Sequence, residues 1–306
     1  MKKLLTFIIF MISSQAIWPE QIKTIFAHGI VDGPSQINRF DQAIATKEKY
    51  SVSFLDATDA TGFGLNYGIF MLTKLFGKHV NRSKMYMAQG PDINSLHKFI
   101  DAQSKPGNGI ILYGCSRGSA TILNYLKKHD HQEIKALVLD ACPASMHEAI
   151  QPTLIKYGIN PSRALSVFTT LFPKYPTVNP ITPLDSIKNI KNKNLPILLI
   201  HSLDDTVVPF EHGLMLYQEF IENGFKNVHF ISIPSGKHSF LLQGKNSKKP
   251  YLQAVHSFYK KYNLPFNELF ATTNLANHAL DGQKVINKIN AYKNLINKKA
   301  LLISKN

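Results

Sequence analysis

The chain contains little cysteine, which limits how it can be held together. Two cysteines, Cys115 and Cys142, occur among 306 residues. Two cysteines are too few for a disulfide-rich scaffold, and a chain of this length can instead be stabilised by a large apolar core. Both cysteines follow predicted strands, and one disulfide between them is possible if those strands are neighbours. Two buried thiols are the preferred interpretation, because cysteine packs readily as a small apolar side chain.

Acidic residues are scarce relative to basic ones. The sequence has 35 lysines and arginines against 20 aspartates and glutamates, a formal net charge of +15. This balance favours a weak attraction to anionic surfaces. The lysines are scattered and are not interleaved with aromatic residues, so no nucleic-acid binding is expected. No specific protein partner can be inferred from the composition.

Long hydrophobic runs are also lacking. The apolar run over residues 4–12 is much shorter than the roughly 20 residues that a membrane span needs. It follows the basic start Met1-Lys2-Lys3 and precedes small residues that end at Ala16. This pattern predicts a signal peptide over residues 1–16 and export to the periplasm or the extracellular space. A core helix and a membrane anchor are the alternatives.

Strands and helices alternate along most of the chain, without an internal repeat. Such alternation predicts an α/β fold, in which a mostly parallel central sheet is covered by helices on both faces. Residues 17–142 and 185–270 would form this core. The predicted strands are 23–27, 50–55, 109–113, 136–139, 195–200 and 228–233, and the predicted helices are 35–49, 119–128, 213–223 and 250–262.

Three stretches depart from the alternation. Residues 143–184 are long for a connection and rich in proline, so we expect a helical cap insertion over the site. Residues 60–90 are rich in apolar side chains. Residues 271–306 form a basic tail, predicted to be helical and to pack on the domain. Its expected apolar face contains Val285, Ile286, Ile289, Leu295, Ile296 and Leu302.

Aromatic residues of the first two stretches suggest an apolar or aromatic group in a ligand, although each is equally compatible with an ordinary core position. These residues are Phe63, Tyr67, Phe70, Phe168, Phe172 and Tyr175.

A Gly-Cys-Ser-Arg-Gly motif at 114–118 stands between a predicted strand and a predicted helix. Gly-x-Ser-x-Gly on such a turn is a nucleophile elbow, which strains the serine backbone and exposes its hydroxyl above the sheet. Gly114 and Gly118 are expected because a Cβ would clash where strand and helix cross. The register places Ser116 at the apex, so Cys115 is not expected to be the nucleophile.

A serine hydroxyl needs a base and an acid to become nucleophilic, and an elbow fold supplies them downstream in the order acid, then histidine. Asp205 follows strand 195–200, and His238 follows strand 228–233. Both would emerge at the edge of the sheet that carries Ser116. Asp204 and Asp140 are rival acids, but the Asp-x-x-Val-Pro context favours Asp205.

Together with His28-Gly29, these motifs resemble the α/β-hydrolase superfamily over residues 22–265. The resemblance implies that Ser116 is the nucleophile, His238 the base and Asp205 the acid. It also implies an oxyanion hole made by two backbone N–H groups. Those donors would be Ile30 and Arg117, and the supporting residues would be His28, Gly29, Gly114 and Gly118.

The resulting expectation is an exported serine hydrolase that cleaves an ester, thioester or amide of a small molecule or peptide through an acyl-enzyme. A serine peptidase, an acyltransferase and a non-catalytic binding module are the alternatives. His129-Asp130-His131 has metal-like spacing, but no third ligand is evident and a solvated turn is expected. No metal and no cofactor are predicted.

Overall fold

The computed structural model describes residues 21–30, 33–54, 85–105, 107–275 and 280–305. The predicted signal peptide at 1–16 lies outside the described residues. So does most of the apolar stretch 60–90, including Phe63, Tyr67 and Phe70. Within the described ranges, no helix is both long and apolar enough to cross a membrane.

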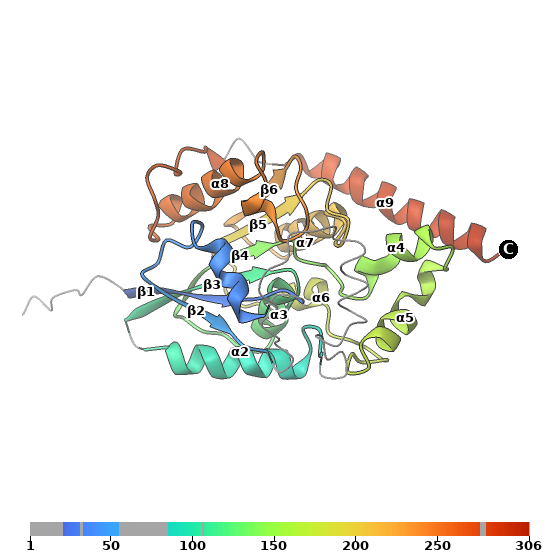
Figure 1. The fold of residues 1–306 in the computed structure, drawn as a ribbon, viewed down its shortest axis with the longest axis horizontal. Helices are drawn as coiled ribbons and strands as arrows, with labels where there is room; N and C mark the ends of the chain where they lie inside the picture. The colour runs from blue at the N-terminus through green and yellow to red at the C-terminus, as the bar shows by residue number, and fades with distance from the viewer. Residues whose placement is uncertain (1–20, 31–32, 55–84, 106, 276–279, 306) are drawn as a thin grey trace, which may run out of the picture.

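The described strands form one parallel sheet in the order β2-β1-β3-β4-β5-β6 (Figure 1). Each predicted strand is present, with ends shifted by a few residues. Strands β3 and β5 are buried almost throughout, which accounts for their nearly continuous apolar sequences. The strands are β1 (Gln21–Ala27), β2 (Glu48–Val52), β3 (Asn108–Cys115), β4 (Ile134–Asp140), β5 (Ile197–Ser202) and β6 (Val228–Ile233).

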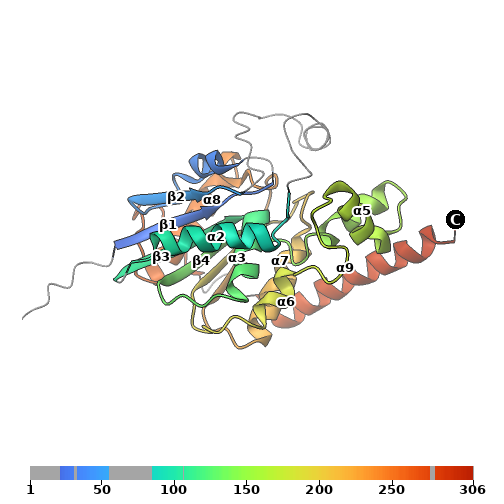
Figure 2. The ribbon, with the colours of Figure 1, turned by 90° about the horizontal axis from the view of Figure 1, so that it is seen from below.

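Helices cover both faces of the sheet, so the predicted α/β-hydrolase fold is confirmed (Figures 1 and 2). One face carries α2 (Gly90–Gln103), α3 (Arg117–Leu126), α6 (Pro183–Ile187) and α7 (Phe210–Glu222). The other face carries the 3-10 helix η1 (Pro34–Phe40) and α8 (Lys248–Lys261).

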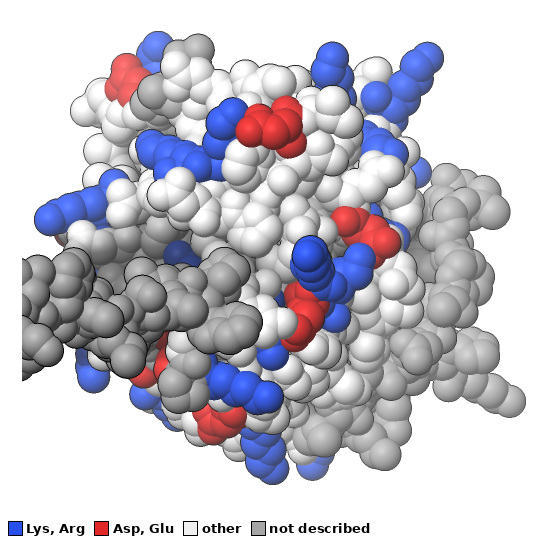
Figure 3. Space-filling model, turned by 90° about the vertical axis from the view of Figure 1, so that its left-hand side faces the viewer, with Lys and Arg blue, Asp and Glu red and all other residues white. Residues whose placement is uncertain are grey.

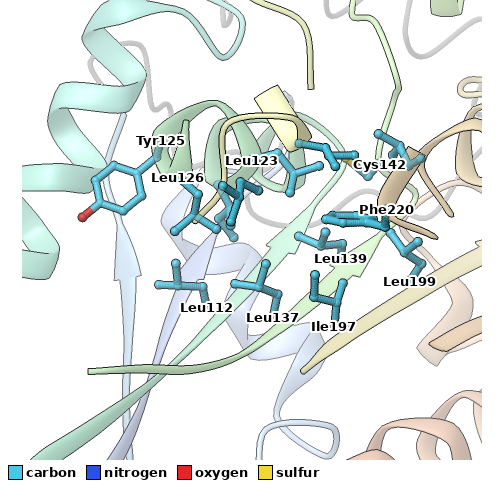
Figure 4. Close-up of a cluster of buried hydrophobic side chains, with 14 of the residues drawn as sticks. Leu112, Leu123, Tyr125, Leu126, Leu137, Leu139, Cys142, Ile197, Leu199 and Phe220 are labelled. Atoms are coloured by element: carbon cyan, nitrogen blue, oxygen red, sulfur yellow. The ribbon is translucent and has the colours of Figure 1, made fainter. Parts of the chain in front are cut away.

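The larger apolar layer lies between the sheet and helices α3 and α7. Leu112, Leu137 and Leu139 project from the strands toward Leu123 of α3 and Phe220 of α7 (Figure 4). All five side chains are fully buried. Full burial of a leucine or phenylalanine contributes about 1.5–3 kcal/mol relative to exposure, so this layer fixes α3 firmly against β3.

The two cysteines lie in different apolar layers. Cys115 is part of the layer under α8, whereas Cys142 is part of the layer under α3 and α7. Both are buried and neither forms a disulfide within the described residues, which confirms the preferred interpretation of two separate thiols.

The helix predicted at 35–49 is wrong in type and length. Residues 34–40 form η1, and residues 48–52 form the edge strand β2, which pairs with β1 from Lys23↔Glu48 to Ala27↔Val52. Pairing with β1 therefore outweighs local helix preference. The predicted apolar positions Phe40, Ala43 and Ile44 are nevertheless buried.

Helix α2 was not predicted, although its sequence carries a signal. Ile93, Leu96 and Ile100 recur at intervals of three and four residues, and all three are buried against the sheet. The segment overlaps the end of the apolar-rich stretch at 60–90, and the helical periodicity of 93–100 was not recognised beside it.

The insertion after β4 lies beyond the carboxyl ends of the strands (Figures 1 and 2). It contains short helices, and Pro152 and Pro161 stand in the first turns of two of them, where proline is tolerated. These helices are η3 (Glu148–Ile150), α4 (Gln151–Lys156), η4 (Pro161–Arg163) and α5 (Ala164–Leu171). The chain then returns to the core at α6, which packs on α3.

The C-terminal tail contains the long helix α9 (Gly282–Ile303). Val285, Ile289 and Ile296 of the expected apolar face are buried. The other expected members of that face, Ile286, Leu295 and Leu302, are 36%, 53% and 50% exposed, so the prediction is wrong for them. Each step along a helix turns the side chain by about 100°, so residues next to a buried position point away from the core. The buried positions of α9 therefore form a narrow stripe.

Helix α9 connects the two parts of the structure. It packs on α7 of the core and on α4 and η4 of the insertion. Asn160 also donates a hydrogen bond from Nδ2 to the carbonyl oxygen of Ala300, at 3.3 Å. The red helix in Figure 1 accordingly runs from the core alongside the insertion.

The basic side chains visible on the face in Figure 3 are dispersed, with acidic side chains between them. The described residues of this face form no concentrated positive patch.

Candidate active site

The strand order places two loops at the centre of the carboxyl edge. The chain leaves β1 toward β2 on one side and later enters β3 on the other side, so the topology switches between β1 and β3. Ligand sites of open parallel sheets form at this point. The loops that follow these two strands contain His28, Gly29 and Ile30, and the 114–118 motif.

The 114–118 motif forms a sharp turn from β3 into α3. Ser116 has φ 52° and ψ −115°, a combination that non-glycine residues rarely adopt. A Cβ on Gly114 would lie 2.5 Å from Cα of Ser119, and one on Gly118 would overlap the carbonyl oxygen of Ala27. Glycine is therefore required at both positions.

Ser116, His238 and Asp205 lie in one hydrogen-bonded row. The Ser116 hydroxyl donates to Nε2 of His238 at 2.9 Å, and Nδ1 of His238 donates to Oδ2 of Asp205 at 2.7 Å. An ionised carboxylate can only accept, so it places the ring proton on Nδ1 and leaves Nε2 to accept. The three residues are 4%, 4% and 9% exposed.

The Asp205 carboxylate is held from both sides. Its Oδ1 accepts the backbone N–H groups of Val207 and Val208, at 2.8 and 2.9 Å. Burial alone would raise the pKa of Asp205, but His238, His201 and the Val207 N–H outweigh it and lower that pKa below its usual value. The carboxylate is thereby kept charged beside the imidazole.

The two rival acids have other partners. Asp204 accepts hydrogen bonds from the hydroxyl of Ser202 at 2.6 Å and from the backbone N–H of Gly236 at 2.8 Å. It therefore fastens the loop before His238 to the end of β5.

Asp140 is fully buried and accepts a hydrogen bond from the hydroxyl of Tyr251 at 3.1 Å. Within the part of the chain that the structure describes, its other carboxyl oxygen has no hydrogen-bond partner. Burial raises the pKa of Asp140 to about 7, against the opposing effects of His238 and Tyr251.

The loop after β1 is fixed by a side chain that sequence analysis missed. Gln36 accepts the Gly29 backbone N–H through Oε1 at 2.6 Å, and its Nε2 donates to Sγ of Cys115 at 3.6 Å. Sγ of Cys115 donates to the hydroxyl of Ser239 at 3.0 Å. These bonds connect the loop that carries Ile30, the elbow and the loop that carries His238.

His28 is buried and turns back on its own loop, donating from Nδ1 to the carbonyl oxygen of Gly29 at 2.6 Å. Helix α3 begins at Arg117, so the Arg117 backbone N–H belongs to the first turn, where N–H groups point out of the helix end. The oxyanion role of Ile30 and Arg117 stays a prediction.

The Arg117 side chain forms a buried ion pair that was also missed. Its Nε and Nη2 donate to the two carboxyl oxygens of Asp92 at 2.9 and 2.7 Å, and both side chains are fully buried. The guanidinium also lies 4.7 Å from the ring centre of Phe54. Two parallel bonds of this kind fix the start of α3 against α2.

The insertion reaches the surroundings of this row of residues. The ring of Phe168 contacts the rings of Phe172 and Tyr175, and these residues share an apolar cluster with Ala120 of α3 and with Ile30. These three aromatic residues are nearly fully buried, so they form the internal packing of the insertion against the core.

Among the described residues, the grouping of possible metal ligands is confined to His97, His129 and His131. His129 and His131 follow the last turn of α3, at the opposite end of that helix from Ser116.

Comparison with known proteins identifies related sequences of similar and of greater length. An acyl-protein thioesterase 1 homolog of Dictyostelium discoideum is 28% identical over 252 residues, which cover 78% of this chain and 91% of that protein. A lysophosphatidylserine lipase of Macaca fascicularis is 27% identical over 138 residues, 42% of this chain and 32% of the lipase.

Among solved structures, an acylaminoacyl peptidase of Pyrococcus horikoshii superposes with a TM-score of 0.50 at 17% identity. The superposition covers 88% of this chain and 40% of the peptidase, so this chain spans less than half of that protein's length. This likeness supports the fold.

The sequence pattern of the prolyl oligopeptidase family matches residues 99–265, more than half of the chain. The match includes Ser116, Asp205 and His238. The chain has the α/β fold of a serine hydrolase and belongs to the prolyl oligopeptidase family.

Proposed function

We propose that the protein hydrolyses a carboxylic ester or thioester, with Ser116 as nucleophile, His238 as base and Asp205 as acid. The observation that carries this proposal is the continuous row of hydrogen bonds from Ser116 to Asp205. A strained serine held against a histidine that is oriented by a buried carboxylate is the arrangement that activates a hydroxyl.

Each group would have one role in the proposed reaction. The Ser116 oxygen attacks the substrate carbonyl carbon while its proton passes to Nε2 of His238. Asp205 stabilises the resulting imidazolium charge. Backbone N–H groups of Ile30 and Arg117 donate hydrogen bonds to the negative oxygen, and each such donor typically contributes about 3 kcal/mol.

Collapse of the tetrahedral intermediate breaks the bond to the leaving group, which takes the proton from His238 and leaves Ser116 acylated. Water then donates a proton to His238 and attacks the acyl carbon. Release of the acid returns that proton to Ser116 and restores the free enzyme.

The relatives favour an ester or thioester as the class of substrate. The Dictyostelium thioesterase homolog aligns over 78% of this chain and 91% of its own length. A serine peptidase is the second candidate, favoured by the prolyl oligopeptidase family match. A panel of acyl esters, acyl thioesters and aminoacyl amides, assayed under one set of conditions, separates the two.

A fluorophosphonate probe tests the nucleophile directly. We expect wild type and Cys115→Ala to be labelled and Ser116→Ala to remain unlabelled, with its turnover reduced by several orders of magnitude. Labelling that survives Ser116→Ala but is lost in Cys115→Ala would refute the assignment. Absence of labelling in a folded wild-type protein would favour a non-catalytic binding module.

We also propose that the protein is exported after removal of residues 1–16. The support is the basic, apolar and small-residue order at the start of the sequence. Mass spectrometry of the N-terminal peptide in the native host should begin at Ile17. An intact N-terminus on all of the protein would contradict export by cleavage.

A further inference from the structure

Three imidazoles from distant parts of the sequence meet at the far end of α3. His97 belongs to α2, whereas His129 and His131 belong to the turn between α3 and β4. One possible ligand atom from each residue lies within 4.8 Å of the other two. The sequence showed His129 and His131 without a third ligand, because His97 lies in the helix that was not predicted.

Carboxylates complete the surroundings of the three rings. The two oxygens of Asp101 lie 3.4 Å from Nδ1 of His97 and 3.8 Å from Nε2 of His131. His97 and Asp101 are four residues apart in α2, so they share one face of the helix. Glu133 lies 3.9 Å from Nδ1 of His131.

The rings are held in place by packing. His97 stacks on His129 with ring centres 4.1 Å apart, and His129 stacks on Tyr125 at 4.6 Å. Nδ1 of His97 is buried and makes no hydrogen bond to any of the described residues. The positions of these rings are therefore restricted before any ligand arrives, which lowers the entropy cost of binding.

We propose that His97, His129, His131 and Asp101 bind a divalent transition-metal ion, with zinc as the best fit. Three imidazoles with one carboxylate form a ligand set that zinc accepts in tetrahedral geometry. Zinc–nitrogen bonds of about 2.0–2.1 Å place ligand atoms about 3.4 Å apart. The ligand atoms of the three histidines lie within 4.8 Å of one another, so binding would require His97 and His129 to turn out of their stacked arrangement.

The position of the cluster indicates a structural role. Helix α3 has 10 residues, so its far end is about 15 Å from the elbow at 1.5 Å per residue. At the elbow end, Asp92 and Arg117 already join α2 to α3 through the buried ion pair. At the other end, a metal ion would join α2 to the turn between α3 and β4. It would thereby hold α2 against α3 at both ends of the helix pair.

Calorimetric titration of the full-length protein with Zn²⁺ tests the site. We expect one bound equivalent in wild type and an affinity at least tenfold lower in His97→Asn and in His131→Asn. His229→Gln is the matched control, because it removes an imidazole outside the cluster and retains a polar group toward Tyr262. Binding that is absent, or equal in all four proteins, would overturn the proposal.

Thermal unfolding supplies an independent measurement. Saturating Zn²⁺ should raise the Tm of wild type and of His229→Gln by several degrees, because the ion binds the folded state. Mg²⁺, which prefers oxygen ligands, should not. If the histidine variants fail to fold, Asp101→Asn replaces them, because its side chain is 51% exposed. A zinc affinity unchanged in Asp101→Asn would then overturn the four-ligand site.

Discussion

The substitution Gly118→Ala tests whether the close crossing of α3 and β1 positions the active-site loop. The added Cβ would overlap the carbonyl oxygen of Ala27 and lie 2.9 Å from that of His28. Contacts below 3.0 Å to backbone are essentially never seen for a Cβ. Neither carbonyl belongs to a flexible side chain, so the backbone itself must move by about 1 Å, a displacement that can reduce catalysis about 100-fold.

The displacement would act on the site through two elements. Ala27 ends β1, so moving it shifts the loop that carries Ile30, while Gly118 follows Arg117 in the first turn of α3. The separation between the two predicted oxyanion donors should therefore change. We expect kcat/KM to fall about 100-fold or more, with a loss of stability of about 1–3 kcal/mol from overpacking.

The assay combines fluorophosphonate labelling rates with urea unfolding. Gly282→Ala is the matched control, because its Cβ would meet no atom within 4 Å and the residue stands at the start of α9. Its labelling rate and stability should remain close to wild type. A Gly118→Ala protein that labels at the wild-type rate would refute the argument that this crossing sets the loop position.

Three further predictions concern side chains around the site. Asp205→Asn should lower kcat by several orders of magnitude and Asp204→Asn far less, because Asp205 bonds to His238 whereas Asp204 bonds to Gly236. Equal losses in steady-state assays would contradict the assignment of Asp205 as the acid. Burial raises the pKa of Asp140 from 3.8 to about 7, so the folded state keeps a proton that the unfolded state loses. Wild type should therefore lose up to about 4 kcal/mol relative to Asp140→Asn between pH 4 and pH 7, and a constant difference in urea unfolding would refute this. Gln36→Leu leaves a buried N–H without its acceptor, so it should lower the free energy of unfolding by about 1–3 kcal/mol and slow labelling; unchanged labelling would show that this bond does not position the loop.

Local sequence was sufficient where one segment contains the whole signal. The strands are apolar runs that can be recognised one at a time. The elbow can be recognised from five residues, because its geometry requires glycine on both sides of Ser116. Asp205 and His238 could be placed because each directly follows a strand whose carboxyl end reaches the same edge.

Features that depend on pairing between distant segments could not be read in this way. Gln36 and Asp92 act through partners about 80 and 25 residues away, and neither has a motif of its own. The helix predicted at 35–49 was wrong because pairing with β1 draws residues 48–52 into a strand. His97 joined His129 only once α2 was placed against α3.

With the predicted cap role of the insertion, the position of α9 has a consequence for how substrates would reach Ser116. Because α9 packs on both α7 and the insertion, the insertion cannot swing away from the core without bending or releasing this helix. Any opening of the insertion is then coupled thermodynamically to detachment at the C-terminus, including the bond from Asn160 to Ala300. A ligand that holds the insertion closed should protect the last turns of the chain from carboxypeptidase digestion, so the end of the polypeptide would report occupancy of the site.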